Sequence, residues 1–106
     1  MKENELRDYL ADDDVMVMLK TIDRLNPIDL PENKLCTIKT LAVNLGKSIT
    51  EVWEMCDKGV SIGVLSYRGG VLSRKRVDLT EFGENILDAD GTEDLRNIIR
   101  GYGDGY

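Results

Sequence analysis

The residues of this chain that could do chemistry are few and lie far apart. There is no histidine, which removes the Ser-His-Asp and Cys-His arrangements of nucleophilic catalysis. The two cysteines, Cys36 and Cys56, lie in apolar stretches and cannot complete a zinc tetrahedron by themselves. We interpret them as reduced core thiols rather than as a redox pair, and we expect no enzymatic activity, metal centre or cofactor.

Two short motifs resemble parts of ligand-binding loops, and each lacks a residue that the loop needs. Gly46-Lys47-Ser48 could end a phosphate-binding loop, but the position that requires the earlier glycine is occupied by Leu41. The run of three aspartates from Asp12 lacks the glycine and the later glutamate of a calcium loop. We therefore expect a turn between helices at the first motif and a helix cap at the second.

The acidic residues are concentrated at the two ends of the chain. The formal net charge is −6; residues 1–14 carry −4, from two basic and six acidic side chains, and residues 88–106 carry −3, from two basic and five acidic. Residues 15–87 carry +1, from ten basic and nine acidic side chains. An acidic total does not by itself exclude nucleic acid as a partner, because phosphate contacts depend on where the cations lie.

The densest group of cations lies between residues 66 and 77, a stretch without an acidic residue. It consists of Arg68, Arg74, Lys75 and Arg76. This group indicates a nucleic-acid contact, and a solvated hairpin surface is the alternative.

The central stretch from Thr37 to Leu65 has the pattern of two short amphipathic helices. Leu41, Ala42 and Leu45 fall on one face at helical spacing, and Gly46 ends that helix. Ser48, with Glu51 three residues later, forms a capping box that starts the next helix, in which Val52 and Cys56 repeat at i and i+4. Together they predict a helix-turn-helix unit.

The helix-turn-helix unit belongs to a longer pattern, made of Leu41-Ala42, Leu45-Gly46, Val52, Cys56, Gly63-Val64-Leu65, and then Leu79, Thr80, Gly83 and Leu87. Through this pattern residues 13–88 resemble the winged helix-turn-helix family of small bacterial and archaeal transcription regulators. The resemblance implies an α+β, mostly helical fold with a three-helix core, a two-stranded β-hairpin wing and a C-terminal helix. It also implies a DNA-binding regulator of transcription.

The wing is expected to be a simple hairpin. Val64–Arg68 and Val71–Leu79 read as strands on either side of Gly69-Gly70, a pair suited to a two-residue turn. With that turn Tyr67 would face Leu72, whereas a glycine bulge would shift the register. Lys34 to Thr37 fits the small strand that precedes the second helix in this family.

The first confident helix and the two ends of the chain complete the expected organisation. An aspartate among Asp12, Asp13 and Asp14 should cap a helix that runs to about Leu25. Its buried face should carry Val15, Met18, Leu19 and Ile22. Residues 1–12 are expected to be an acidic arm, either a frayed helical turn or a loose segment. Residues 89–100 should form a short helix capped by Thr92, which must dock on the chain's own first helix or on a partner, and residues 101–106 a disordered tail.

Two functions remain open. If the chain binds double-stranded DNA, its third helix lies in the major groove and its wing on the phosphate backbone. The expected contacts are Lys47, Ser48, Thr50, Glu51, Glu54 and Lys58 from the helix, and Arg68, Arg74, Lys75 and Arg76 from the wing. Because Glu51, Glu54 and Asp57 make that helix acidic, the alternative is a protein-protein interaction module without direct DNA binding.

Apolar residues beyond the needs of one small core suggest self-association. These are Met16 and Val17 near the start of the chain, and Leu95, Ile98 and Ile99 near its end. They predict a homodimer. No apolar run is long enough to span a membrane and the charged N-terminus is unlike a signal peptide, so we expect a cytoplasmic protein with no membrane partner.

Overall fold

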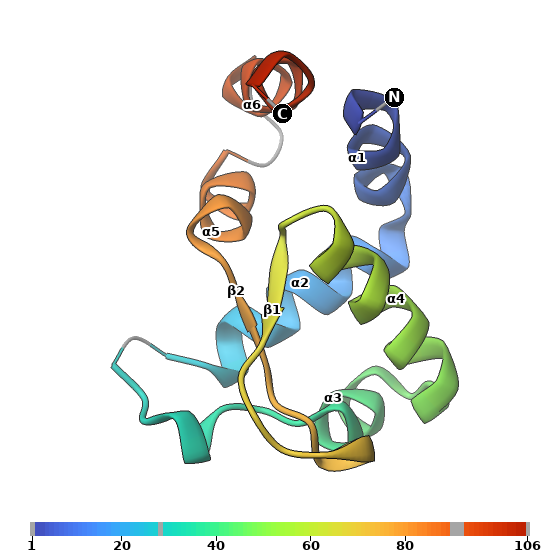
Figure 1. Ribbon diagram of the computed structural model, residues 1–106. Helices are drawn as coiled ribbons and strands as arrows, with labels where there is room; N and C mark the ends of the chain where they lie inside the picture. The colour runs from blue at the N-terminus through green and yellow to red at the C-terminus, as the bar shows by residue number, and fades with distance from the viewer. Residues whose placement is uncertain (1, 28, 90–92, 106) are drawn as a thin grey trace.

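Six α-helices and one antiparallel hairpin make up most of the part of the chain that the computed structural model describes, residues 2–27, 29–89 and 93–105 (Figure 1). In chain order the elements are α1 (Lys2–Ala11), α2 (Asp13–Leu25), η1 (Glu32–Lys34), α3 (Ile38–Leu45), α4 (Ile49–Ser61), β1 (Leu65–Tyr67), η2 (Leu72–Arg74), β2 (Val77–Leu79), α5 (Glu81–Asp88) and α6 (Glu93–Gly105), where η marks a 3-10 turn. This is a mostly helical α+β domain, as predicted. No helix in the described ranges is both long and apolar enough to cross a membrane.

The hydrophobic core is built on α2. Asp12 caps this helix by accepting a hydrogen bond from the backbone N–H of Asp14 at 2.9 Å. The predicted face is confirmed, because its four apolar side chains are all buried: Val15, Met18, Leu19 and Ile22. They pack in one cluster with Ile38 and Leu41 of α3 and with Val52 and Cys56 of α4.

The turn between α3 and α4 is also confirmed. Gly46 ends α3 in the left-handed conformation, with φ of 66°. The Ser48 side chain accepts from the Glu51 backbone N–H at 3.1 Å, and the Glu51 carboxylate accepts from the Ser48 backbone N–H at 3.4 Å. This reciprocal pair starts α4, since it satisfies two backbone donors that the first helical turn cannot.

The hairpin after α4 exists, but its predicted turn and register are wrong. Tyr67 pairs with Val77, and not with Leu72, so the strands are shorter than expected and residues 68–76 form a loop. Gly69 and Gly70 have positive φ, but η2 extends the turn beyond them. The backbone N–H of Arg76 donates to Gly69 O at 2.8 Å, which closes the loop.

A third extended segment explains this wider loop. Thr37 and Arg76 form an antiparallel bridge, the Val77 N–H donates to Cys36 O at 3.0 Å, and the Ile38 N–H donates to Lys75 O at 3.0 Å. The chain before α3 therefore pairs with the far side of β2. The strand expected over Lys34 to Thr37 is reduced to this one bridge, because Glu32–Lys34 is a 3-10 turn.

The start of α5 gives a physical reason for the Thr80 and Gly83 pair in the sequence motif. The Thr80 hydroxyl donates to Gly63 O at 2.6 Å and accepts from the Gly83 N–H at 3.0 Å. A Cβ on Gly83 would overlap the carbonyl oxygen of Val64. The motif thus holds α5 directly against the chain that leads into β1.

The two ends of the chain differ from expectation. Residues 2–11 form a helix rather than a loose arm, because Leu6 and Tyr9 are buried in the core. Helix α6 continues to Gly105 rather than ending at Arg100, and Tyr102 stacks on Phe82 of α5 with ring centroids 5.3 Å apart. Helices α1 and α6 pack against each other (Figure 1). The expected cap Thr92 lies outside the described residues.

Candidate nucleic-acid interface

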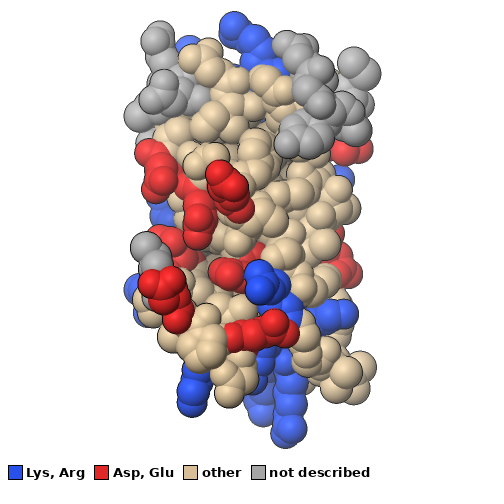
Figure 2. Space-filling view, turned by 60° about the vertical axis from the view of Figure 1, so that its left-hand side comes forward, with Lys and Arg blue, Asp and Glu red and all other residues tan. Residues whose placement is uncertain are grey.

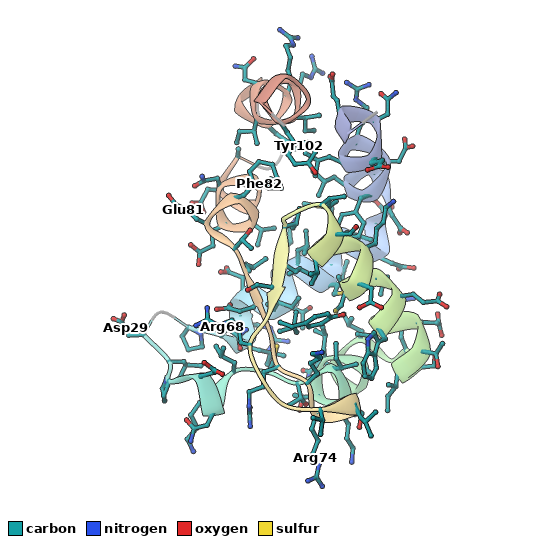
Figure 3. The ribbon with its side chains drawn as sticks, in the orientation of Figure 1. Asp29, Arg68, Arg74, Glu81, Phe82 and Tyr102 are labelled. Carbon is teal, nitrogen blue, oxygen red and sulfur yellow. The ribbon has the colours of Figure 1, made fainter. Side chains whose placement is uncertain are left out.

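Five basic residues lie on the two segments that pair with each other, the start of α3 and the hairpin loop. The bridge from Thr37 to Arg76 places the loop beside α3, and η2 contacts α3. We call this set the basic end; it comprises Lys39, Arg68, Arg74, Lys75 and Arg76. In Figure 2, Lys and Arg side chains gather at the lower end of the molecule, below a band of Asp and Glu. Arg74 points away from the body of the protein at this end, whereas Arg68 lies higher beside the hairpin, level with Asp29 (Figure 3).

Lys39 was not among the residues predicted from the sequence. It becomes part of the basic end only because Ile38 is hydrogen-bonded to Lys75 across the loop. The available signal was the short strand expected before the second helix, which had to pair with something. Its partner was not identifiable, since that pairing joins residues far apart in the chain.

Two members of the basic end are held by the protein itself. The Arg76 guanidinium donates to the carbonyl oxygen of Leu35 at 2.6 Å and is half-buried. The Lys75 ammonium lies over the ring of Tyr67, 4.8 Å from its centroid. Both side chains stabilise the loop, so they are less available to a ligand than the sequence suggested.

The other three cations are exposed. Among the described residues, Lys39, Arg68 and Arg74 have neither a carboxylate within ion-pair distance nor a side-chain hydrogen bond. One acidic group approaches the loop: the Glu32 carboxylate lies beside Gly69, where a Cβ would be 2.8 Å from Glu32 Oε1. The basic end therefore offers solvent-facing guanidinium and ammonium groups of the kind that contact phosphate.

The predicted contacts at the start of α4 are partly used within the fold. Lys47 forms an ion pair with Asp14 at 3.1 Å and approaches Glu51 at 3.9 Å. The hydrogen bond to Asp14 raises the pKa of Lys47 above its ordinary value. Ser48 and Glu51 form the capping box. Of the residues predicted here, Thr50 alone is exposed without a partner among the described side chains.

Helix α1 lies beside the middle of α4, which the sequence did not indicate. The Tyr9 hydroxyl donates to Met55 O at 2.7 Å, and burial raises the pKa of this phenol. Glu54 and Lys58 line a cleft of about 220 Å³ together with Asp8 and Asp12. The predicted contacts Glu54 and Lys58 thus share their surface with further carboxylates, which repel phosphate.

The hairpin is fixed to α4 through one side chain. Tyr67 of β1 donates a short hydrogen bond to the Asp57 carboxylate, while Lys75 covers its ring. Burial, followed by the bond to Asp57, raises the pKa of this phenol above its ordinary value. This contact sets the position of the loop relative to α4.

Both cysteines are buried and free, as predicted for core thiols. Burial raises the pKa of Cys36 to about 11 and that of Cys56 to about 12, so both remain protonated near neutral pH. Low-pKa, exposed thiols are the reactive ones. Neither cysteine has that character.

A second cleft, of about 550 Å³, is lined by the end of α2, the loop before α3, β2 and α5, and it is acidic. Its carboxylates come from Asp23, Asp29, Asp78 and Glu84 (Asp29 is labelled in Figure 3). Within the described residues no group of histidine, cysteine, aspartate and glutamate side chains has an arrangement that could hold a metal ion.

This chain matches no protein-family model, no curated protein and no solved structure.

Proposed function

We propose that the protein is a winged helix-turn-helix regulator of transcription that binds double-stranded DNA. The order of α2, the Thr37 bridge, α3, α4 and the hairpin supports this proposal, because the resemblance implies the same order over residues 13–88. In this proposal the loop of residues 68–76 is the wing. The N-terminal half of α4 enters the major groove, where Thr50 faces base edges.

The observation that carries the proposal is the set of exposed cations on α3 and the hairpin loop, Lys39, Arg68 and Arg74. Helix α3, η2 and the N-terminus of α4 lie at the same end of the molecule (Figure 1). Arg68, Arg74 and Lys39 would contact phosphates there, with the backbone at Lys47 and Ser48 facing another phosphate. The acidic middle of α4, next to α1, would point away from the duplex.

A protein-protein interaction module is the second candidate. It is favoured by apolar side chains exposed at the same end, namely Val43 at 74%, Val71 at 71% and Leu72 at 76%. Leu72 also has a positive φ of 54°, which is uncommon for a residue with a large side chain. A polypeptide with acidic and apolar residues would complement this surface.

Binding of random duplex DNA across a salt series separates the two functions. The Arg68→Gln, Arg74→Gln double variant should bind all sequences more weakly and flatten the log-log salt dependence by about two units, if both side chains touch phosphate. Thr50→Ala should instead change the preferred sequence. Fluorescence anisotropy with labelled DNA measures both effects.

Arg76→Gln is the matched control within the wing. Because Arg76 is bonded to Leu35 O, this variant should lose stability while its salt dependence changes less. If the parent protein retains no duplex DNA even at low salt, the DNA proposal fails and the interaction module is the better account.

The predicted homodimer stays a prediction. Its apolar residues Leu95, Ile98 and Ile99 pack against the chain's own core, so they are not wholly free for a partner.

A further inference from the structure

A cleft with three arginines lies at the far end of the molecule from the basic end. It follows the seam between α1 and α6, the two helices that stand together at the top of Figure 1. Its volume is about 290 Å³, and it is lined by Glu3, Arg7, Arg96, Ile99 and Arg100. Neither the resemblance nor the proposed DNA contact accounts for it.

Two of the three arginines of this cleft have no anionic partner within the described part of the chain. Arg7 donates to the Glu3 carboxylate at 2.7 Å, which occupies one guanidinium. Arg96 and Arg100 lie one turn apart on α6, both are exposed, and neither forms an ion pair or hydrogen bond within the described residues. Like charges at i and i+4 repel each other, so the proximity of these two guanidinium groups is unfavourable unless an anion binds.

We propose that this cleft binds a small phosphate-bearing anion that bridges α1 and α6. A phosphate group has three acceptor oxygens and close to two negative charges near neutral pH, so it can accept from guanidinium groups on both helices. Arginine provides a planar pair of donors that matches phosphate geometry. The anion would also remove the repulsion between Arg96 and Arg100.

The size of the cleft defines the class of ligand further. A volume of about 290 Å³ is at the small end for ligand pockets, which suits a diphosphate or a phosphorylated small molecule. Ile99 offers an apolar surface for a carbon portion of that ligand. The phosphodiester of a phospholipid headgroup also offers anionic oxygens to guanidinium groups, although with one negative charge, so the experiment must distinguish a free anion from a membrane surface. The proposal does not depend on DNA binding, which would use the opposite end of the molecule.

Thermal unfolding with added pyrophosphate tests the site. At constant ionic strength the melting temperature should rise and then saturate with pyrophosphate, since the ligand binds only the folded state. The Arg96→Gln, Arg100→Gln double variant should bind at least about tenfold more weakly by calorimetry. Both substitutions are on an exposed helix surface, and circular dichroism checks that the variant is folded.

The Arg68→Gln, Arg74→Gln variant is the matched control, because it removes two exposed arginines from the other end of the molecule. It should retain the full response to pyrophosphate. An equal response in both double variants, or an equal response to sodium chloride, would overturn the proposal.

Co-sedimentation with phosphatidylglycerol vesicles is the second arm. If vesicle binding needs Arg96 and Arg100 and pyrophosphate has no effect, the ligand is a lipid headgroup. If neither pyrophosphate nor vesicles bind, the site is rejected.

Discussion

Gly59 is a glycine at which neighbouring side chains leave no room for a Cβ. It is buried on α4, and a Cβ there would lie 2.5 Å from the Tyr9 hydroxyl and 2.8 Å from Leu65 Cδ1. Gly59→Ala should therefore displace Tyr9 and weaken its hydrogen bond to Met55 O. We expect the free energy of unfolding in urea to fall by about 1–3 kcal/mol.

Gly101→Ala provides the control for that prediction. Gly101 also lies within a helix, but no atom is within 4 Å of the position its Cβ would take. The better helix propensity of alanine should then raise stability by roughly 0.5–1 kcal/mol. The same sign for both substitutions would contradict the packing argument.

At this scale the sequence predicted what depends on near neighbours in the chain. Ser48 and Glu51, three residues apart, predicted the capping box, and Gly46 predicted the end of α3. Tyr67 and Arg76 gave no such signal, because their partners Asp57 and Leu35 lie ten and 41 residues away. The candidate site was therefore found as a set of residue types, while the partners that hold some of them in place were not.

Asn26 joins three elements that are separate in the sequence. Its side chain accepts from the Cys36 N–H at 2.8 Å and donates to Val77 O at 2.9 Å, which ties the end of α2 to the segment before α3 and to β2. Asn26→Ala would leave both backbone groups without this partner. We expect urea unfolding to show a loss of about 2 kcal/mol or more, because each buried polar group left unpaired costs roughly 1–3 kcal/mol.

Asn44→Ala is the comparison, since Asn44 is an exposed asparagine that donates to Thr40 O of its own helix at 2.9 Å and accepts only a long 3.5 Å bond from the exposed Arg24. Its replacement should change stability by no more than about 0.5 kcal/mol. Equal losses for the two variants would show that Asn26 does not act as a link between elements.

The hairpin shows why elements are easier to predict than their pairing. The extended segments on either side of Gly69-Gly70 predicted two strands, and two strands are present. The register was wrong because it is set by Thr37 and Cys36, which pair with the outer edge of β2. A two-residue turn would have satisfied the local glycines but not this remote pairing.

For the whole molecule, the two ends of the chain were the least predictable part. Residues 1–12 are acidic and residues 101–106 are rich in glycine, which suggested loose segments. Residues 2–11 and 93–105 instead form helices, and Leu6, Tyr9 and Tyr102 of these helices are buried in the core. Charge and glycine content are local quantities, while this burial needs both ends to meet.

The stability of the whole fold should depend on alkaline pH through its two buried thiols. Burial raises the pKa of Cys36 from 9.0 to about 11 and that of Cys56 from 9.0 to about 12. The folded state thus holds protons that the unfolded state releases above pH 9.0. Stability from this source is complete below that pH and is lost as the pH rises toward the folded values. Between pH 8 and pH 10, ionisation of each thiol in the unfolded state should lower the free energy of unfolding by about 1.4 kcal/mol.

Urea unfolding under reducing conditions at these two pH values measures the loss, and two core variants on α4 isolate its cause. Cys56→Ala and Val52→Ala each truncate a fully buried side chain of that helix, so both should be less stable than the parent at pH 8. Between pH 8 and pH 10, Val52→Ala should lose as much stability as the parent, while Cys56→Ala should lose about 1.4 kcal/mol less. The buried phenol of Tyr9 and the phenol of Tyr67 add to the loss mainly above pH 10, because their pKa values are also raised, so the comparison stops there. If Cys56→Ala keeps the full pH dependence of the parent, the Cys56 thiol is not its source.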